Sequence, residues 1–434
     1  MPCIPNVLTA AVPAAAAVGG RTGPRKAGLA GGLSAWLLAS LLAPVLATAG
    51  PPQLVLVDDS PRPAELTAIA EGWRLSFLDA GHPAVRSAAD IVRWGQRVEA
   101  VQGPQVILSG GSLLVVDRVE VRDGRLWIES PTWGQVDMPL EAVRGIVLHP
   151  PHDATVRDRL IDRVRRATGE HDQLWLENED TAGGQLTAIN GRQVLLRTDT
   201  DDVAVAISDV LAVVRRPERP TATPRPAGLE VLIGLRDGSL LHCQGAVLAE
   251  GRLRVQLVDG PELASVDPLL PDDAPAVVSL EVLGGRVTYL PDIQPISYRH
   301  IPYLDLAWPW HADRNVLGGQ LRDQGGLYSK GLGMHSAARL AYSLEGNPRR
   351  FDAAVALDQA AGQGGSVVFR VFLDAGPEGW RKAWESPVVR GGQPPLPLSV
   401  ELGGARRLAL LVDFADRADV LDYANWLDPR LVGP

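Results

Sequence analysis

Hydrophobic and polar residues alternate along most of the chain, in short runs that end at glycine-containing turns. Residues 106–108 and 113–121, for example, form two such runs on either side of Ser109-Gly-Gly-Ser112. Alternation with a period of two is typical of a strand that has one face buried and the other in solvent. The chain is therefore predicted to consist almost entirely of short β-strands.

The middle of the chain repeats this pattern. Three segments each hold a strand, a polar turn, a second strand, a glycine-containing turn and two further strands, and a weaker copy precedes them. The second turn is Asp123-Gly124, Asn190-Gly191 or Glu250-Gly251, and such pairs favour tight hairpins because both turn residues need positive φ. This order of strands and turns resembles that of small Sm-like or SH3-like barrels. The predicted units are residues 50–100 (the weaker copy), 101–150, 173–216 and 230–286.

Two segments interrupt the β pattern. Residues 151–172 are predicted to form a helical connector, because four apolar residues recur at helical spacing; they are Val156, Leu160, Ile161 and Val164. Residues 217–229 are predicted to be a proline-rich linker. His149 and His152 have the spacing of metal ligands, but two prolines separate them, so we interpret this stretch as a rigid connector.

The N-terminus has the features of a targeting segment. A basic patch at residues 21–26 precedes the apolar run 27–46, which ends in Ala47-Thr48-Ala49. This order predicts a signal peptide over residues 1–49 and an exported chain. The alternative is an N-terminal membrane anchor, because about 20 apolar residues can span a bilayer. If the leader is cleaved, no later stretch is long and apolar enough for stable membrane insertion.

Composition narrows the functional classes. The 51 acidic residues exceed the 42 basic ones, for a net charge of −9, which argues against a nucleic-acid partner. Cys243 is the sole cysteine outside the leader, so no intramolecular disulfide is expected. The motifs of zinc hydrolases, serine hydrolases and phosphate-binding loops are absent from the sequence. The protein is accordingly predicted not to be an enzyme.

The last third of the chain is rich in Trp, Tyr, His and Gly. Three motifs follow in order: Lys330-Gly-Leu-Gly-Met-His335-Ser336, Gly365-Ser-Val-Val-Phe-Arg-Val371 and Trp426-Leu-Asp428. Residues 287–434 thereby resemble the NPCBM family of carbohydrate-binding modules, whose fold is a galactose-binding-like jelly-roll β-sandwich. The expected fold class is therefore all-β, with tandem barrel-like units before a C-terminal sandwich. The tail departs from the family, because Tyr423-Ala-Asn425 stands where a histidine is common.

The resemblance implies binding of a glycan, with galactose-type sugars as the natural class. Sugars are recognised by an aromatic ring face together with planar polar side chains. Both kinds of group gather around two of the motifs, so the predicted carbohydrate site comprises Trp308, Trp310, His311, Asp313, Lys330 and His335. Trp426, close to the chain end, is instead predicted to lie in the core.

A series of acidic residues near the C-terminus raises the question of a metal ion. Asp413, Asp416 and Asp419 could ligate a structural Ca²⁺, which prefers carboxylate oxygens. The alternative is that they cap turns and remain solvated. No other cofactor is predicted.

Three functions follow in order of preference. The first is an exported, non-catalytic glycan-binding protein. The second is a cell-envelope scaffold whose sandwich no longer binds sugar and whose repeat units bind envelope proteins. The third is a glycoside hydrolase, because a pair of carboxylates is enough for that chemistry; the candidate pairs are Asp358 with Asp374, and Asp413 with Asp428.

Overall fold

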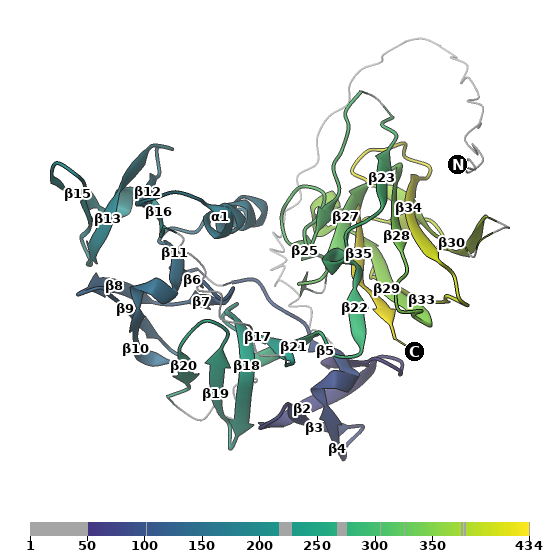
Figure 1. Cartoon of the computed structure of the whole chain (residues 1–434), viewed down its shortest axis with the longest axis horizontal. Coiled ribbons are helices and arrows are strands. Elements are labelled where there is room, and N and C mark those ends of the chain that lie inside the picture. Colours follow the sequence, from purple (N-terminus) through teal and green to yellow (C-terminus); the bar gives the residue numbers. More distant parts are fainter. Residues whose placement is uncertain are drawn as a thin grey trace, which may run out of the picture. The chain divides into compact units, whose positions relative to one another are not determined.

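The structure is a computed structural model that describes residues 51–100, 102–216, 228–266, 276–303, 305–324, 326–374, 376 and 379–433. The chain divides into two compact units, residues 1–50 and 51–434. The predicted signal peptide and most of the proline-rich linker lie outside the described residues. The all-β prediction is confirmed, since one α-helix, α1 (Ala154–Arg166), stands among many strands in the described ranges (Figure 1). That helix is too short and too polar to cross a membrane, and the described residues contain no other candidate span.

Strands β1 to β21 belong to the repeat region. Their bounds are β1 (Gln53–Leu56), β2 (Arg62–Ala70), β3 (Arg74–Asp79), β4 (His82–Ser87), β5 (Ile91–Gly95), β6 (Gln105–Leu108), β7 (Leu113–Val115), β8 (Arg118–Arg122), β9 (Arg125–Ser130), β10 (Gly134–Pro139), β11 (Val143–Val147), β12 (Asp172–Leu176), β13 (Thr181–Ile189), β14 (Gln193–Arg197), β15 (Asp202–Ala206), β16 (Val210–Val214), β17 (Glu230–Leu235), β18 (Leu240–Ala249), β19 (Arg252–Leu257), β20 (Glu262–Ala264) and β21 (Val277–Leu283).

One pairing pattern recurs four times in this region. The first strand of a unit pairs antiparallel with its last strand, in β1–β5, β6–β11, β12–β16 and β17–β21. A short 3₁₀ turn precedes the last strand in three of the units: η1 (Ala88–Asp90), η2 (Leu140–Ala142) and η3 (Ile207–Asp209). Last strands also pair between units, β11 with β16 and β5 with β21. The likeness to Sm or SH3 barrels and the boundaries of the units remain predictions.

Helix α1 forms where the sequence predicts it. Asp153 caps its N-terminus, since its Oδ1 accepts a hydrogen bond from the Val156 backbone N–H at 2.9 Å. Leu160, Ile161 and Val164 are buried in an apolar cluster against strands β6, β7, β11 and β16. Val156 is 51% exposed, so its assignment to the buried face is wrong. The apolar cluster begins one turn later than the pattern suggests.

The C-terminal region is a β-sandwich of two six-stranded sheets. One sheet contains β22 (Val287–Tyr289), β24 (His311–Ala312), β27 (Gly331–His335), β29 (Arg350–Leu357), β33 (Leu396–Glu401) and β35 (Tyr423–Val432). The other contains β23 (Ser297–His300), β28 (Ala338–Ser343), β30 (Ser366–Asp374), β31 (Trp380–Glu385), β32 (Val389–Arg390) and β34 (Arg407–Phe414). The remaining elements are η4 (Leu290–Asp292), η5 (Gln359–Ala361) and the hairpin of β25 (Leu321–Arg322) and β26 (Leu327–Tyr328).

Large apolar side chains from both sheets meet in the sandwich core. Trp426 of β35 is fully buried, and its ring centroid lies 5.1 Å from that of Phe369 of β30, edge to face. Phe351 of β29 contacts the same indole from its own sheet. The predicted core position of Trp426 is confirmed.

The sandwich packs on the first repeat unit and on α1. A small apolar cluster joins the two regions; its members are Val55, Val57, Val92, Val287, Tyr289 and Val432. Arg93 donates a hydrogen bond to Asp428 at 2.9 Å. Buried Asp158 of α1 forms an ion pair with Arg322 and accepts a hydrogen bond from the Gln320 backbone N–H at 2.9 Å. These contacts fix the hairpin β25–β26 beside the helix.

Candidate functional site

A tryptophan lies flat on a histidine at one end of the sandwich. The loop between β23 and β24 places the Trp308 indole over the His335 imidazole, with ring centroids 4.6 Å apart and planes 3° from parallel. The backbone of Trp308 is held from β23: the Tyr298 hydroxyl donates to its carbonyl at 2.6 Å, and its N–H donates to His300 Nδ1 at 3.2 Å. The indole is therefore fixed both through its ring and through its backbone.

Two further rings complete what we call the aromatic cluster: Trp308, His335, His300 and Tyr423. The Tyr423 ring centroid lies 6.1 Å from Trp308 and 6.0 Å from His335, and that of His300 lies 6.0 Å from His335. Trp308 and Tyr423 are half-buried, whereas His335 is 3% exposed. Half-exposed rings of this kind can stack on the C–H face of a sugar.

Hydrogen bonds to the Ser336 backbone hold the two histidine rings of the cluster in place. His335 Nδ1 lies 2.8 Å from the Ser336 carbonyl oxygen, and His300 Nε2 contacts the same oxygen at 3.0 Å. Because that oxygen can only accept, both ring nitrogens act as donors. Burial lowers the pKa of His335, which favours the neutral ring. His335 therefore supports Trp308.

Asp422 anchors the strand that carries Tyr423. It accepts hydrogen bonds from the Ser336 hydroxyl at 2.5 Å and from the Ser366 N–H at 2.9 Å. Burial is the largest influence on its carboxyl group and raises its pKa to about 6, despite these two donors. Asp422 thus links the end of β27 to the starts of β30 and β35, next in sequence to Tyr423 of the aromatic cluster.

The structure separates the predicted sugar-binding residues into different surroundings. Trp308 and His335 meet in the aromatic cluster, whereas Trp310 packs partly buried against the sandwich core. Lys330, with 15% of its side chain exposed, pairs with Asp292 at 2.6 Å and with Asp313 at 3.1 Å. This pairing fixes η4 and the residue that follows β24 to the start of β27.

His311 faces the helical side of the sandwich. It pairs with Gly333 in β24–β27 and is half-buried. Burial lowers its pKa, and the positive charge of Arg166 on α1 lowers it further. His311, Asp313 and Lys330 thus belong to the surface that meets α1.

Two of the three acidic residues proposed for calcium, Asp413 and Asp416, are engaged by arginines. Asp413 accepts from Arg370 at 2.7 Å, and both oxygens of Asp416 accept from Arg390, at 2.9 and 2.6 Å. Throughout the described ranges, no group of three or more His, Cys, Asp or Glu side chains is arranged to hold a metal ion. The structure thus offers no support for the calcium hypothesis.

The carboxylates considered for hydrolysis are similarly occupied. Asp358 accepts from the Arg322 N–H at 3.1 Å, from Asn425 at 2.8 Å and from the Ala360 N–H at 3.0 Å. Asp374 accepts from Arg407 and from the Gly376 N–H, and Asp428 accepts from Arg93. Each carboxylate has a structural role as a hydrogen-bond acceptor.

His300 and Tyr423 were not identified from the sequence as site residues, and Asp422 was considered solely as a member of the acidic series near the C-terminus. Tyr423 was noted solely because it stands where the related family has a histidine. In the structure, the register of β27 on β35 places His335 opposite Tyr423. That register follows from long-range strand pairing, which no local pattern in the sequence encodes.

Comparison with known proteins assigns the C-terminal region. Residues 286–432 match the family described as NPCBM/NEW2 domain, which confirms the resemblance found in the sequence. A Renibacterium salmoninarum protein that is named for an assumed endo-alpha-N-acetylgalactosaminidase activity is 27% identical over 115 residues. The match covers 26% of this chain and 7% of that protein, so this chain corresponds to a small part of its relative.

Two solved structures from Clostridium perfringens are similar in fold. CBM51-2 with the INT domains of ZmpB, in complex with GlcNAc, is 24% identical and covers 44% of this chain and 37% of its own, with a TM-score of 0.30. The CBM51 of GH95, in complex with methyl-galactose, is 23% identical and covers 34% of this chain and 99% of its own, also with a TM-score of 0.30.

Proposed function

We propose that this protein is an exported, non-catalytic glycan-binding protein that binds sugar at the aromatic cluster of its C-terminal NPCBM/NEW2 domain. The observation that carries the proposal is the Trp308 indole, stacked on His335 beside the half-exposed ring of Tyr423. The match of residues 286–432 to this domain family supports the same assignment.

The geometry suits recognition of a sugar ring. Trp308 is positioned by a buried histidine and by two backbone hydrogen bonds, so binding costs little additional side-chain entropy. The charge of Asp419, a half-buried residue, acts on the pKa of His335, and we propose its carboxylate as the polar partner of the rings. An aromatic face with an adjacent carboxylate can hold the C–H surface and a hydroxyl of one sugar.

We propose that the protein is not a glycoside hydrolase because its candidate carboxylates already accept hydrogen bonds within the protein. Glycoside hydrolysis requires two carboxyl groups that are free to act on one glycosidic bond. Asp358, Asp374 and Asp428 instead accept hydrogen bonds from arginines or from backbone N–H groups of the protein itself. This arrangement supports a binding role.

The proposed function is tested with the full chain and two tryptophan variants. Calorimetric titration with methyl galactoside and with GlcNAc, preceded by a glycan array, measures affinity for wild type, Trp308→Ala and Trp127→Ala. Trp127 is a matched control, because it is half-buried in β9 beneath the Arg122 guanidinium, 4.3 Å from its ring centroid. We expect wild type and Trp127→Ala to bind equally and Trp308→Ala to lose at least tenfold in affinity. Equal binding by both variants, or no binding by folded wild type, would contradict the proposal.

Export is tested separately. The full chain and a variant without residues 1–49 are expressed in a bacterial host, and both are assayed in the cytoplasmic, membrane, periplasmic and medium fractions. We expect the full chain outside the cytoplasm with a shortened N-terminus, and the truncated chain inside. An uncleaved chain in the membrane fraction would favour the N-terminal anchor.

A further inference from the structure

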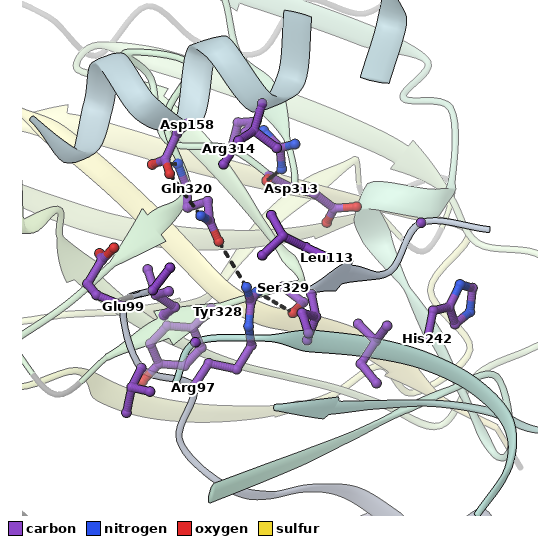
Figure 2. A pocket seen from close by; sticks show the side chains of 18 of the residues that line it. Arg97, Glu99, Leu113, Asp158, His242, Asp313, Arg314, Gln320, Tyr328 and Ser329 are labelled. Atoms are coloured by element: carbon purple, nitrogen blue, oxygen red, sulfur yellow. Dashed lines mark hydrogen bonds between the residues drawn. The ribbon is translucent and has the colours of Figure 1, made fainter. Parts of the chain in front are cut away.

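A hollow lies where the sandwich meets α1 and the repeat units (Figure 2). Its volume is about 250 Å³, and Arg97 reaches into it between Gln320 and Ser329. Five basic and three acidic side chains line it: Arg97, Arg157, Arg165, Arg314 and Lys330, with Glu99, Asp158 and Asp313. The lining therefore carries an excess of positive charge.

Most of these charges are paired, and two arginines are not. Arg157 pairs with Glu99, Arg314 with Asp162 and Lys330 with Asp313. Arg97 donates instead to neutral acceptors, Ser329 Oγ at 2.8 Å and Gln320 Oε1 at 3.1 Å. Arg165 donates to the Gly111 carbonyl at 3.4 Å. Among the described residues, neither Arg97 nor Arg165 has a carboxylate oxygen within ion-pair distance.

The surroundings of Arg97 and Arg165 disfavour the positive charges of the two guanidinium groups. Burial and the positive charges of Arg314 and Arg97 lower the pKa of Arg165 to about 10. Burial also lowers the pKa of Arg97, opposed most by the carboxylate of Glu281. Burial raises the pKa of Glu281 itself, and the charge of Arg97 opposes that rise. The Arg165 and Arg314 Nε–H groups are buried without an acceptor, which is itself costly.

We propose that this hollow binds an oxyanion, the carboxylate or sulfate group of a small ligand, between Arg97 and Arg165. A guanidinium group binds such oxygens through paired N–H donors, most strongly where water is excluded. A volume of 250 Å³ exceeds the roughly 30 Å³ share of one water molecule several times over. It can hold a free inorganic ion with water, or the acidic end of a sugar. The site is separate from the aromatic cluster.

The first test measures thermal unfolding of the full chain with added anions at constant ionic strength. The ligands are sulfate, glucuronate and, as a neutral control, glucose. Arg165→Gln removes one of the two unpaired charges. Arg163→Gln is the matched control, because it removes the same charge from an exposed position on the same helix. We expect an anion to raise the melting temperature of wild type and Arg163→Gln by about 2–4 °C, and to leave Arg165→Gln unchanged.

The outcomes separate the sources of the oxyanion. A rise with sulfate alone identifies a free inorganic ion, and a rise with glucuronate alone identifies a sugar acid. An equal rise in all three proteins, or no rise in wild type, overturns the proposal. Trp308→Ala should retain the anion response, so the failure of the aromatic site and the failure of this one are distinguishable.

A crystallographic measurement covers the case in which Arg165→Gln does not fold. Wild-type crystals are soaked in selenate, whose anomalous scattering locates the ion directly. A peak between the guanidinium groups of Arg97 and Arg165 supports the proposal. A structure with no peak there overturns it.

Discussion

The indole of Trp308 and the imidazole of His335 lie parallel, with 4.6 Å between their centroids. The two residues come from different environments: Trp308 from a loop, and His335 from β27, where every residue is buried. Stacking on a residue of a buried strand thereby restricts the side chain of a loop residue. Preorganisation of this kind lowers the entropic cost of binding at the proposed sugar site.

The role of His335 can be separated from direct sugar contact. Because His335 is 3% exposed, we class it as a positioning residue and expect its ring shape to matter more than its nitrogens. His335→Phe keeps a flat ring beneath Trp308 and should retain glycan affinity within about threefold, about 0.7 kcal/mol on the affinity scale. His335→Ala removes the ring and should lose about tenfold or more. Equal losses in both variants, measured by titration calorimetry, would show that the imidazole itself binds the sugar.

Asp422 gives the sandwich a defined pH dependence. Its folded-state pKa of about 6 lies above the value of about 3.9 expected in an unfolded chain. Between these two values the Asp422 carboxyl group is protonated in the folded chain and ionised in the unfolded chain. The stability that comes from this proton is fully present below about pH 4 and is lost as the pH rises through about 6. Asp422→Asn mimics the protonated acid, so its melting temperature should rise relative to wild type by about 4 °C or more between pH 4 and pH 7.

Asp416→Asn is the control for this experiment. The Arg390 guanidinium holds the pKa of Asp416 well below its usual range, which is the opposite shift. Asp416 stabilises the fold above about pH 4 and loses that contribution as the pH falls. The Asp416→Asn variant should therefore gain nothing on wild type as the pH rises. A parallel gain in both variants would assign the pH effect to another group.

Local patterns in the sequence were sufficient to predict a chain of β-strands with one helix. The strand alternation, the helix at α1 and the buried Trp426 all follow from spacing and residue type. Val156 was misplaced because helical spacing shows which residues share a face, but not where along the helix that face meets its neighbour.

The site depended on information that spacing does not contain. Trp308 and His335 were both identified, but Tyr423 and His300 reach them through the pairings β27–β35 and β23–β28. Asp313 was grouped with Trp308 because the two are close in sequence, and Lys330 because it stands in the glycine-rich motif with His335. In the structure, Asp313 and Lys330 pair with each other on the surface toward α1. The cavity around Arg97 and Arg165 arises from three separate regions of the chain, so no single segment indicates it.

The glycines of the Lys330–His335 motif are required by close packing in β27. A Cβ atom at Gly333 would lie 2.4 Å from the Arg314 carbonyl oxygen and 2.5 Å from the Val316 backbone nitrogen. Backbone atoms cannot yield as side chains do, so Gly333→Ala should cost about 1–3 kcal/mol in the free energy of unfolding. Gly245→Ala in β18, where the nearest atom is a side-chain carbon at 3.7 Å, should be nearly neutral. Urea denaturation measures both, and equal effects would contradict the packing argument.

Trp426 stabilises the sandwich through its volume and shape. Trp426→Ala leaves a cavity between Phe351 and Phe369 and should cost about 3–5 kcal/mol. The indole N–H is buried with no acceptor in the described part of the chain, so Trp426→Phe removes an unsatisfied donor while keeping most of the ring. We therefore expect Trp426→Phe to cost less than half as much as Trp426→Ala in urea denaturation. A phenylalanine variant as unstable as the alanine variant would mean that the indole N–H does have a partner, such as a buried water.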